Sequence, residues 1–301
     1  MNVTFRQLEI FRALVATGSI SAAARMTNVT QPTASVHLRD LTETIGMPLY
    51  EVIGRKVYLT EVGKELAKAA RGVRAEWNAF RQSIQALQGG EAGLLRVAMV
   101  NSAQYFAPRL LGVFCASRPK VEVSIALLNR DGVADRMRAN QDDLYIMSRP
   151  PEGLSLTCQS FMPNPLVVVA PRGHALAKRG RLLPEDLLSE RFIARESGSG
   201  TRLAVDDFFR RQPRSPEVRF ELGSNEAIIE AVAGGMGLAI LSEHALRAGG
   251  RRDLVTLDVE GFPLPSSWQI VHPAGRRLSP LAAAFRDHLL AQAAAPVTVT
   301  A

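Results

Sequence analysis

The stretch of sequence that most limits the fold is TNVTQPTASVHLRDLTETIG, residues 27–46. Thr30 can cap a helix whose first turn holds Pro32, at a position where a missing N–H costs little. Apolar residues at helical spacing predict one buried face: Ala34, Leu38, Leu41 and Ile45. The opposite face carries short or planar hydrogen-bonding groups instead of long charges: Gln31, Thr33, Ser35 and His37, with Arg39 just beyond.

Two shorter helices are predicted before this stretch. Thr4 is a candidate cap for a helix that ends at Gly18 and carries one apolar face: Phe5, Leu8, Phe11, Leu14 and Val15. Ser19 is expected to cap a second helix, SISAAARM, and the turn TNV follows it. Downstream, PLYEVIGRKVYLT predicts two short strands around Ile53-Gly54-Arg55-Lys56. Together these segments predict a winged helix-turn-helix over residues 1–60.

This order of elements suggests a function for the polar face, because a DNA major groove admits one helix. Gln31 can pair with adenine, and the hydroxyls of Thr33 and Ser35 can donate, accept or lie against a thymine methyl. Phosphates or flanking bases are the expected contacts of the remaining groups: His37, Arg39, Arg55 and Lys56. The alternative is a solvent-exposed helix of an unrelated bundle, which this combination of cap, turn, polar face and basic hairpin disfavours.

Charge and composition are compatible with a polyanionic partner. The 301-residue chain has a net charge of +7, and its first 89 residues hold eleven Lys and Arg against seven Asp and Glu. No apolar run approaches the roughly 20 residues that span a bilayer. The N-terminal apolar residues are interrupted by charges, unlike a signal-peptide core. We therefore expect a cytoplasmic protein without a membrane partner.

Metal and redox chemistry find little support in the sequence. The five histidines form no HxxxH or HExxH pair, so no metal site is expected. Cys115 and Cys158 lie in mostly apolar patterns and are expected to be reduced packing residues. A redox pair stays open as the alternative.

A long helix without proline is predicted from Thr60 to about Gln88, as a linker over residues 61–89. Apolar residues alternate spacings of four and three along it: Leu66, Ala70, Val73, Trp77, Phe80, Ile84 and Leu87. This seam of three heptads favours dimerisation, which would place two recognition helices on two half-sites. Packing of the helix on its own domain is the alternative. Gly89-Gly90 is expected to end the helix at a hinge.

Strands and helices alternate in the rest of the chain. Apolar segments predict strands at 94–100, 121–128, 143–147, 165–170 and 266–272, and in RFIA, VRFEL and GLAILS. QYFAPRLLGVFCA, DGVADRMRAN, SNEAIIEAVAGG, 201–211 and 280–292 are predicted helices. This alternation predicts two parallel α/β units in tandem, which form a two-lobed body over residues 94–293 with a cleft between the lobes.

Polar segments follow several of the predicted strands, where ligands of such sheets bind. They are Asn101-Ser102-Ala103-Gln104, Asn129-Arg130, Ser148-Arg149, Ser197–Arg202 and Ser224-Asn225-Glu226. The last two segments stand at the start of predicted helices, where they offer free N–H groups and hydroxyls. Arg130, Arg149 and Arg202 lie nearby. An anionic small molecule is therefore favoured, although any one segment could be an ordinary cap or turn.

Several runs resemble the LysR-type transcriptional regulators. In the DNA-binding domain they are Leu8, Ser19-Ile20-Ser21-Ala22-Ala23-Ala24, Thr30-Gln31-Pro32 and Leu59-Thr60-Glu61-Val62-Gly63. Further runs resemble the regulators of RuBisCO (Calvin-cycle) operons: YFAPRLLGVFC, DDLYIM, NPLVVVAP, SGSGTRLA and ELGSNEAI…AVAGGMGLAILS. The resemblance implies that Ser21, Thr30 and Pro32 lie at the DNA with Gln31.

The resemblance also implies an effector domain similar to periplasmic binding proteins. Lobe I would hold residues 94–162 and 267–293, lobe II residues 165–264, and residues 294–301 would form a tail. The implied effectors are phosphorylated sugars, phosphoenolpyruvate or NADPH, bound by Ser102, Ala103, Gln104, Asn129, Met147, Thr201 and Arg202. The polar segments add Arg130, Ser148, Ser224 and Asn225. The implied partners are double-stranded promoter DNA, RNA polymerase and further copies in a homodimer or homotetramer.

Two departures from the family pattern bear on specificity. Val52-Ile53 stands where many members have an arginine before the wing glycine, which removes one backbone contact. Ser102-Ala103-Gln104-Tyr105 stands where related regulators often have Thr-Ala-Lys-Tyr, so a positive charge beside the implied ligand is lost. The identity of the effector and of the operon is therefore open.

The leading hypothesis is a DNA-binding activator that responds to an anionic metabolite and controls carbon-fixation genes. A LysR-type regulator of a different metabolic operon is the alternative. A solute-binding protein would explain residues 94–293 but not the helix-turn-helix, and it would need an export signal. Enzymes on such sheets often carry G-x-G-x-x-G, G-x-x-x-x-G-K-[ST] or G-x-S-x-G, none of which is found, so we expect neither an enzyme nor a cofactor.

Overall fold

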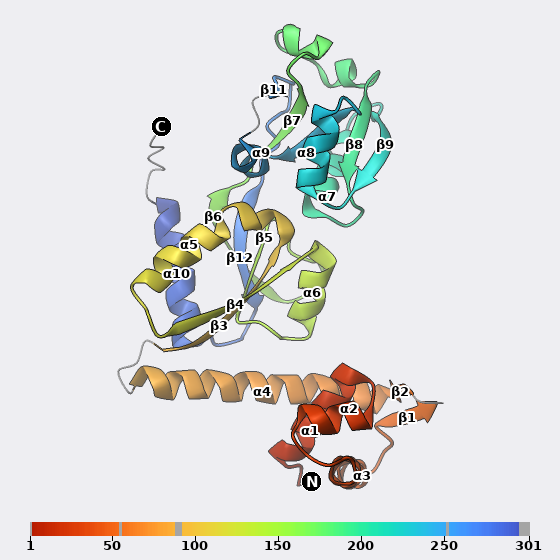
Figure 1. The fold of residues 1–301 in the computed structure, drawn as a ribbon, viewed down its shortest axis with the longest axis vertical. Helices are drawn as coiled ribbons and strands as arrows, with labels where there is room; N and C mark the ends of the chain where they lie inside the picture. Colours follow the sequence, from red (N-terminus) through yellow and green to blue (C-terminus); the bar gives the residue numbers. More distant parts are fainter. Residues whose placement is uncertain (1, 54–55, 88–91, 251–252, 295–301) are drawn as a thin grey trace. The chain divides into compact units, whose positions relative to one another are not determined.

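The computed structural model describes residues 2–53, 56–87, 92–250 and 253–294 (Figure 1). The chain divides into two compact units, one of residues 1–81 and 139–141 and the other of residues 82–138 and 142–301. No helix in the described ranges is long and apolar enough to cross a membrane.

Three helices open the first unit: α1 (Phe5–Thr17), α2 (Ile20–Met26) and α3 (Gln31–Ile45). Thr4 and Gln7 form a capping box that starts α1, and Gly18 ends it in the left-handed conformation (φ 64°). The helices enclose an apolar core: Ile10, Phe11, Leu14, Ala23, Ala24, Ala34, Leu38, Leu41 and Leu49. Ser19 is the N-cap residue of α2, as expected, although its side chain makes no capping hydrogen bond.

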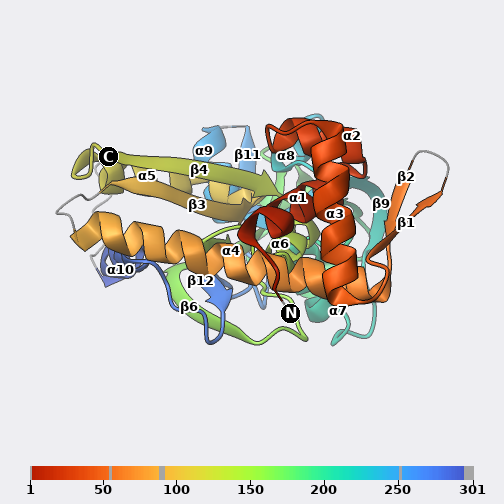
Figure 2. The same ribbon diagram turned by 90° about the horizontal axis from the view of Figure 1, so that it is seen from below.

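A hairpin and a long helix complete the first unit. β1 (Tyr50–Ile53) pairs antiparallel with β2 (Lys56–Leu59), and α4 (Glu61–Leu87) follows. Gly63 is required where α4 begins, because a Cβ there would lie 1.9 Å from the Leu49 carbonyl oxygen. Figures 1 and 2 show the three helices and the hairpin grouped around the first turns of α4. Residues 54–55 of the expected wing tip and the Gly89-Gly90 hinge lie outside the described residues.

The second unit begins with a five-stranded sheet of order β4-β3-β5-β12-β6. Its strands are β3 (Gly93–Val100), β4 (Val121–Leu128), β5 (Leu144–Met147), β6 (Leu156–Pro163) and β12 (Ser267–Pro273). One face packs on α5 (Ala107–Ala116) and α10 (Pro280–Ala294), around Phe114, Trp268 and Phe285. α6 (Arg130–Arg138) covers the other face through Val133 and Met137. We call this part lobe I.

Lobe II holds a second five-stranded sheet, of order β11-β7-β10-β8-β9. The strands are β7 (Leu166–Pro171), β8 (Arg191–Arg195), β9 (Glu217–Leu222), β10 (Leu238–Ser242) and β11 (Leu254–Leu257). α7 (Gly200–Phe209) packs on one face with the short helices η2 (Ala175–Lys178) and η3 (Pro184–Leu187). α8 (Asn225–Ala233) and α9 (Glu243–Gly249) pack on the other.

Both sheets are mixed, and the expectation of purely parallel sheets was wrong. β12 runs antiparallel to β5 and β6, and β7 runs antiparallel to β10 and β11. The cause is the path of the chain, which leaves lobe I after β6 and returns to it with β12. The two crossing segments lie side by side, since the Asn164 N–H donates to the Ser266 carbonyl at 2.8 Å.

Four local expectations also need correction. β6 and β11 were not predicted as strands. The segment QYFAPRLLGVFCA is divided between the 3-10 helix η1 (Asn101–Tyr105) and α5, with Pro108 in the first turn of α5. Cys158 is exposed on β6, so it is not a buried packing residue, whereas Cys115 is half-buried beside the lobe I core.

Candidate functional site

The polar face of α3 presents a row of exposed side chains. Gln31, Pro32, Thr33 and Arg39 are exposed, while Ser35 and His37 are half-buried. Thr30 caps the helix, because its hydroxyl accepts from the Thr33 N–H. Val36 lies one turn beyond Pro32 and is 44% exposed, although the sequence reasoning passed over it. An exposed valine there adds an apolar group of the kind that contacts thymine methyls.

Hydrogen bonds hold the turn between α2 and α3. The Ser21 hydroxyl donates to the Gln31 side-chain oxygen at 2.9 Å, which joins the first turns of the two helices. The Thr27 hydroxyl donates to the Ala23 carbonyl at 2.8 Å, and Arg6 donates to the Thr27 carbonyl at 2.7 Å. These bonds fix α2 and α3 relative to each other, so the candidate base-reading side chains project from a rigid support. Lys56 is exposed on β2, whereas Arg55 lies outside the described residues.

The apolar seam of α4 falls into two parts. Leu66 is partly buried against the core of its own unit and Ala70 is buried, so little of their surface is left for a second copy. Four further seam residues are exposed: Val73, Trp77, Phe80 and Ile84. The Trp77 ring lies 5.5 Å from that of Phe5 and 5.4 Å from that of Phe80, measured between centroids. The side chain of Leu87 is outside the described residues.

A polar cavity lies between lobes I and II, which belong to the same compact unit. Lobe I contributes residues that end or follow the parallel strands β3, β4 and β5: Val100, Asn101, Ser102, Asn129, Arg130, Met147, Ser148 and Arg149. Lobe II contributes the end of β8 and the start of α7: Arg195, Glu196, Ser199, Gly200 and Thr201. Strand ends and a helix N-terminus therefore converge on one space, which suits an anion.

Arginines of this cavity are held by neighbouring groups. Arg195 is 5% exposed; its Nε and Nη2 donate to Glu196 at 2.6 and 2.8 Å, and its Nη1 donates to Asn225 at 2.7 Å. The Nε of Arg130 donates to the Arg149 carbonyl at 2.9 Å. The Ser199 hydroxyl caps α7 by accepting from the Arg202 N–H at 3.1 Å. An anion that entered would compete with Glu196 for Arg195.

Two polar bridges join the lobes beside the cavity. Arg149 of lobe I pairs with Asp207 of lobe II, and this bond lowers the pKa of the Asp207 carboxyl. Gln104 and Tyr105 of lobe I donate to the Glu226 carboxylate at 2.9 and 2.8 Å. Burial first, and then the bond to Glu226, raises the pKa of Tyr105 to about 12. Burial raises the pKa of Glu226, but hydrogen bonds from Ser224, its own N–H and Tyr105 outweigh that effect and lower it overall.

Both parts of the chain match models of one protein family. Residues 5–64 match the bacterial regulatory helix-turn-helix protein of the lysR family, and residues 88–294 match the LysR substrate binding domain. The chain belongs to the LysR family. It is a LysR-type transcriptional regulator with an N-terminal winged helix-turn-helix and a two-lobed α/β effector domain, as the sequence predicted.

Relatives of this LysR-type regulator are similar over nearly its whole length. The transcriptional activator CmpR of Synechocystis is 43% identical over 291 residues, which cover 96% of each chain. A RuBisCO operon transcriptional regulator of Acidithiobacillus ferrooxidans is 42% identical over 294 residues, or 97% of this chain and 95% of that one. These relatives are transcriptional regulators.

Solved structures agree with the architecture. The regulatory domain of Synechocystis CcmR in complex with 2-PG is 48% identical, with a TM-score of 0.64 over 66% of this chain and 96% of that one. A full-length OxyR variant of Pseudomonas aeruginosa reaches a TM-score of 0.76 over 96% and 98% of the two chains. OxyR is 20% identical, so it supports the fold alone.

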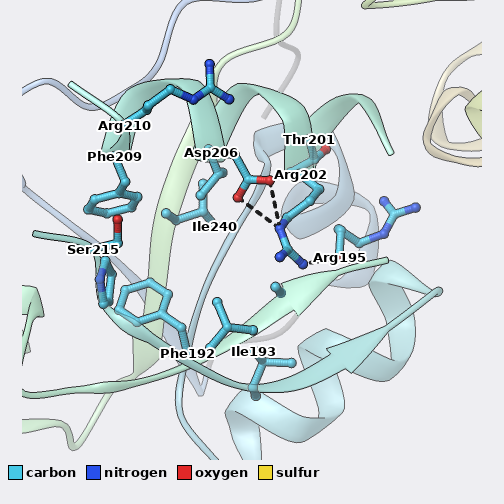
Figure 3. Close-up of a pocket in the computed structure, with 14 residues that line it drawn as sticks. Phe192, Ile193, Arg195, Thr201, Arg202, Asp206, Phe209, Arg210, Ser215 and Ile240 are labelled. Atoms are coloured by element: carbon cyan, nitrogen blue, oxygen red, sulfur yellow. Dashed lines mark hydrogen bonds and ion pairs between the residues drawn. The ribbon is translucent and has the colours of Figure 1, made fainter. Parts of the chain in front are cut away.

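Six of the predicted effector residues of this LysR-type regulator line the cavity: Ser102, Asn129, Arg130, Met147, Ser148 and Thr201. The others lie elsewhere. Ala103 is buried in the lobe I core, and Gln104 bonds to Glu226. Ser224 caps α8, and the Asn225 side chain accepts a hydrogen bond from Arg195. Arg202 pairs with Asp206 and Glu221 and lines a different pocket within lobe II (Figure 3).

Arg195 and Glu196 were missed, although a basic residue closing the apolar strand RFIAR was the available signal. Metal chemistry has no visible site, because the described ranges hold no group of three or more His, Cys, Asp or Glu placed to bind an ion.

Proposed function

We propose that this LysR-type regulator binds promoter DNA through the exposed face of α3 and controls carbon-fixation genes in response to a small anionic metabolite. The observation that carries the proposal is the cavity where three strand ends of lobe I meet Arg195 and the N-terminus of α7. Similarity to RuBisCO operon regulators over nearly the whole chain supports the class of target genes.

DNA recognition would divide between the helix and the hairpin. Gln31, Thr33 and Val36 would contact base edges, with Ser35, His37 and Arg39 further along the groove. Ser21 would keep Gln31 in position through the bond between their side chains. Lys56 and Arg55 of the hairpin would contact phosphates, which add affinity and register but little sequence information.

The ligand class favoured here is a small phosphorylated carboxylic acid. Arg130 and Arg195 supply positive charge, and Ser102, Ser148 and Thr201 supply hydroxyls. The cavity as it stands is small, about 20 Å³, so a ligand must displace Glu196 or part the lobes to enter. This favours phosphoglycolate or phosphoenolpyruvate over the larger NADPH among the effectors that the family suggests. CcmR, whose regulatory domain was solved with 2-PG, is a relative that fits this chemistry.

Displacement of Glu196 from Arg195 would let the ligand change the arrangement of the two lobes. An anion that takes its place on Arg195 would draw together groups of both lobes, since Arg130 and Ser102 belong to lobe I. Such a ligand shifts the protein only as far as it binds one lobe arrangement more tightly than another. That preference would bias the spacing of the DNA-binding domains and their contacts with RNA polymerase.

Assembly through α4 completes the proposed function. Trp77, Phe80 and Ile84 form an exposed apolar stripe that a second copy would cover, and two such dimers would form a homotetramer. Residues 61–89 then serve as the dimerisation linker between the DNA-binding domain at 1–60 and the effector domain at 94–293. A regulator of this kind acts where the chromosome is, so the proposal implies a cytoplasmic protein without enzymatic activity or cofactor.

One observation favours a second candidate, a LysR-type regulator of a different metabolic operon. Gln104 replaces the lysine that related regulators often have, and its amide donates to Glu226. A lysine would form an ion pair there instead. The bridge between the lobes therefore carries one positive charge less than in those relatives, and the metabolite that closes the lobes can be a different one.

Calorimetric titration of the full chain with 2-phosphoglycolate tests the proposed cleft. We expect saturable binding that Arg195→Gln and Thr201→Val each weaken by about tenfold or more. Arg191→Gln is the matched control, because Arg191 is exposed at the opposite end of β8. Equal affinity in all four proteins, or no binding at all to the folded wild type, would contradict the assignment of this anion.

A further inference from the structure

Lobe II contains a second pocket on the α7 side of its sheet (Figure 3). The cavity measures about 270 Å³ and is bounded by α7, β8, β9, β10 and the loop at 215–216. Its walls are mainly apolar: Phe192, Ile193, Val205, Phe209, Val218 and Ile240. All but Val205 and Val218 are at most 5% exposed, so the apolar surface is inside the lobe. A cavity near the low end of ligand-pocket volumes suits a molecule of one or two rings.

A small polar group borders this apolar space. Arg202 donates from Nε to both carboxylate oxygens of Asp206, at 2.9 and 3.1 Å. Thr201, Arg210 and Ser215 also line the pocket. Figure 3 shows the Arg202–Asp206 pair between Ile240 and Arg195, and Ser215 beside Phe209. The pocket thus offers aromatic and aliphatic walls together with hydrogen-bonding groups.

The three arginines that line the pocket are each paired with a carboxylate. Arg202 is paired with Asp206 and also donates to Glu221 at 3.1 Å. Arg210 donates to Asp207 at 2.9 Å, and Arg195 is held by Glu196. Each cation therefore has a carboxylate partner, and a charged ligand would have to break one of these pairs. An uncharged ligand would not.

We propose that this pocket is a second ligand site, which takes a small uncharged aromatic compound with a hydroxyl or amine group. The ring would lie between Phe192 and Phe209, where offset or edge-to-face contacts add to the burial of apolar area. The polar group of the compound would meet Asp206 or Ser215 at the border. This site is separate in chemistry from the anion cavity between the lobes.

The two sites share a wall. Arg195 and Thr201 line both the cavity between the lobes and the pocket within lobe II. α7 starts at the first with Gly200 and continues past the second with Val205 and Phe209. A ring compound that shifts α7 would therefore change the affinity for an anion at the other end of the helix. This coupling rests on the proposed function of the cleft, whereas binding of the ring compound does not.

Fluorine NMR of 4-fluorophenol with the full-length protein, in the absence of any phosphorylated anion, tests the site. We expect saturable binding that Val205→Phe weakens by more than about tenfold, because the added ring fills the cavity. Val218→Trp should weaken binding in the same way, and because Val218 is 46% exposed at the rim, the larger side chain does not disturb the packing of the core. Leu183→Trp is the control, since Leu183 is exposed in lobe II away from the pocket.

No saturable binding to the wild type, or equal binding in the wild type and both pocket variants, would overturn the site. The coupling is tested separately by titrating 2-phosphoglycolate with and without saturating 4-fluorophenol. We expect the anion affinity to change by about fivefold or more, and the phenol affinity to change by the same factor. An unchanged anion affinity while the phenol is bound would overturn the coupling and leave the site. Failure of 2-phosphoglycolate to bind under any condition would count against the proposed function of the cleft instead.

Discussion

The polar face of α3 and the cavity between the lobes differ in how their side chains are held. The α3 side chains come from nine consecutive residues, 31–39, and most of them point to solvent. The cavity gathers residues from Val100 to Thr201, and Arg195 within it is almost fully buried among bonded partners. A local surface can therefore present free groups to DNA, whereas the assembled cavity is preorganised by bonds that a ligand must partly replace.

This difference has an energetic consequence. Removing an exposed side chain from α3 deletes a contact with DNA and leaves the fold intact. Removing a buried side chain from the cavity leaves Glu196 or Asn225 without its partner, so ligand affinity and stability change together. In the absence of DNA, a substitution in α3 should therefore leave the anion site folded and its affinity unchanged.

The largest effect is expected where α3 is anchored. Leu38 is fully buried, so Leu38→Ala should cost about 2–5 kcal/mol of unfolding free energy in the N-terminal unit. Denaturation followed by circular dichroism measures this loss, and DNA binding should fall with it. Affinity for 2-phosphoglycolate should stay at the wild-type value. Loss of anion binding in this variant would contradict the independence of the two regions.

A second test breaks the assembly that brings two α3 helices together. Trp77 is 49% exposed and lies against Phe5 and Phe80. Trp77→Glu should shift the protein toward the monomer in sedimentation velocity, because a charge would be buried in the apolar stripe. Leu183→Glu introduces the same charge on lobe II and serves as the control. An unchanged mass for Trp77→Glu would show that the stripe is not the dimer contact.

Gln31 provides the sharpest test of base reading. Gln31→Ala should weaken specific DNA binding by about 1–3 kcal/mol while nonspecific binding stays constant. Fluorescence anisotropy at one fixed salt concentration measures both. Gln292→Ala changes an exposed glutamine of α10 in the effector domain and should have no effect. Equal losses on specific and nonspecific DNA would instead assign Gln31 to the phosphate backbone.

The smallest effect concerns pH and the bridge between the lobes. Arg149 lowers the pKa of Asp207, so the stabilisation from this carboxylate is present above its unfolded pKa of about 3.9 and is lost as the pH falls through the folded value. Asp207→Asn should therefore be less stable than the wild type at pH 6, and the gap should narrow toward pH 3. Urea denaturation at both pH values measures the gap. A gap that widened in acid would contradict the ion pair.

The sequence predicted local features better than assembled ones. The Thr30 cap, Pro32 and the apolar spacing of α3 lie within one segment, so they predict the helix and its polar face. The antiparallel return of β12 depends on a partner strand more than a hundred residues away, and no local pattern records it. Arg202 was expected in the cavity from the family resemblance and from its polar segment at a helix start. Successive helix residues point about 100° apart, however, and Arg202 turns to Asp206.

Arg195 was missed because its role also depends on contacts between residues that are distant in the sequence. Its strand predicts burial, which disfavours a charge, but the adjacent Glu196 and the Asn225 side chain thirty residues later satisfy the buried guanidinium. Nothing in the sequence pairs Arg195 with Asn225. The exposed Val36 was overlooked for the opposite reason, because a valine in a helix is usually taken for a core residue.

The central claim is that the exposed face of α3 binds a specific DNA site and that an anion between the lobes changes this complex. The most direct test is a footprint on the DNA upstream of the gene, at fixed salt, with and without 2-phosphoglycolate. We predict a specific footprint over several helical turns whose length or bend changes when the anion is added. Binding that is only nonspecific, vanishes at moderate salt and is indifferent to the anion would contradict the account.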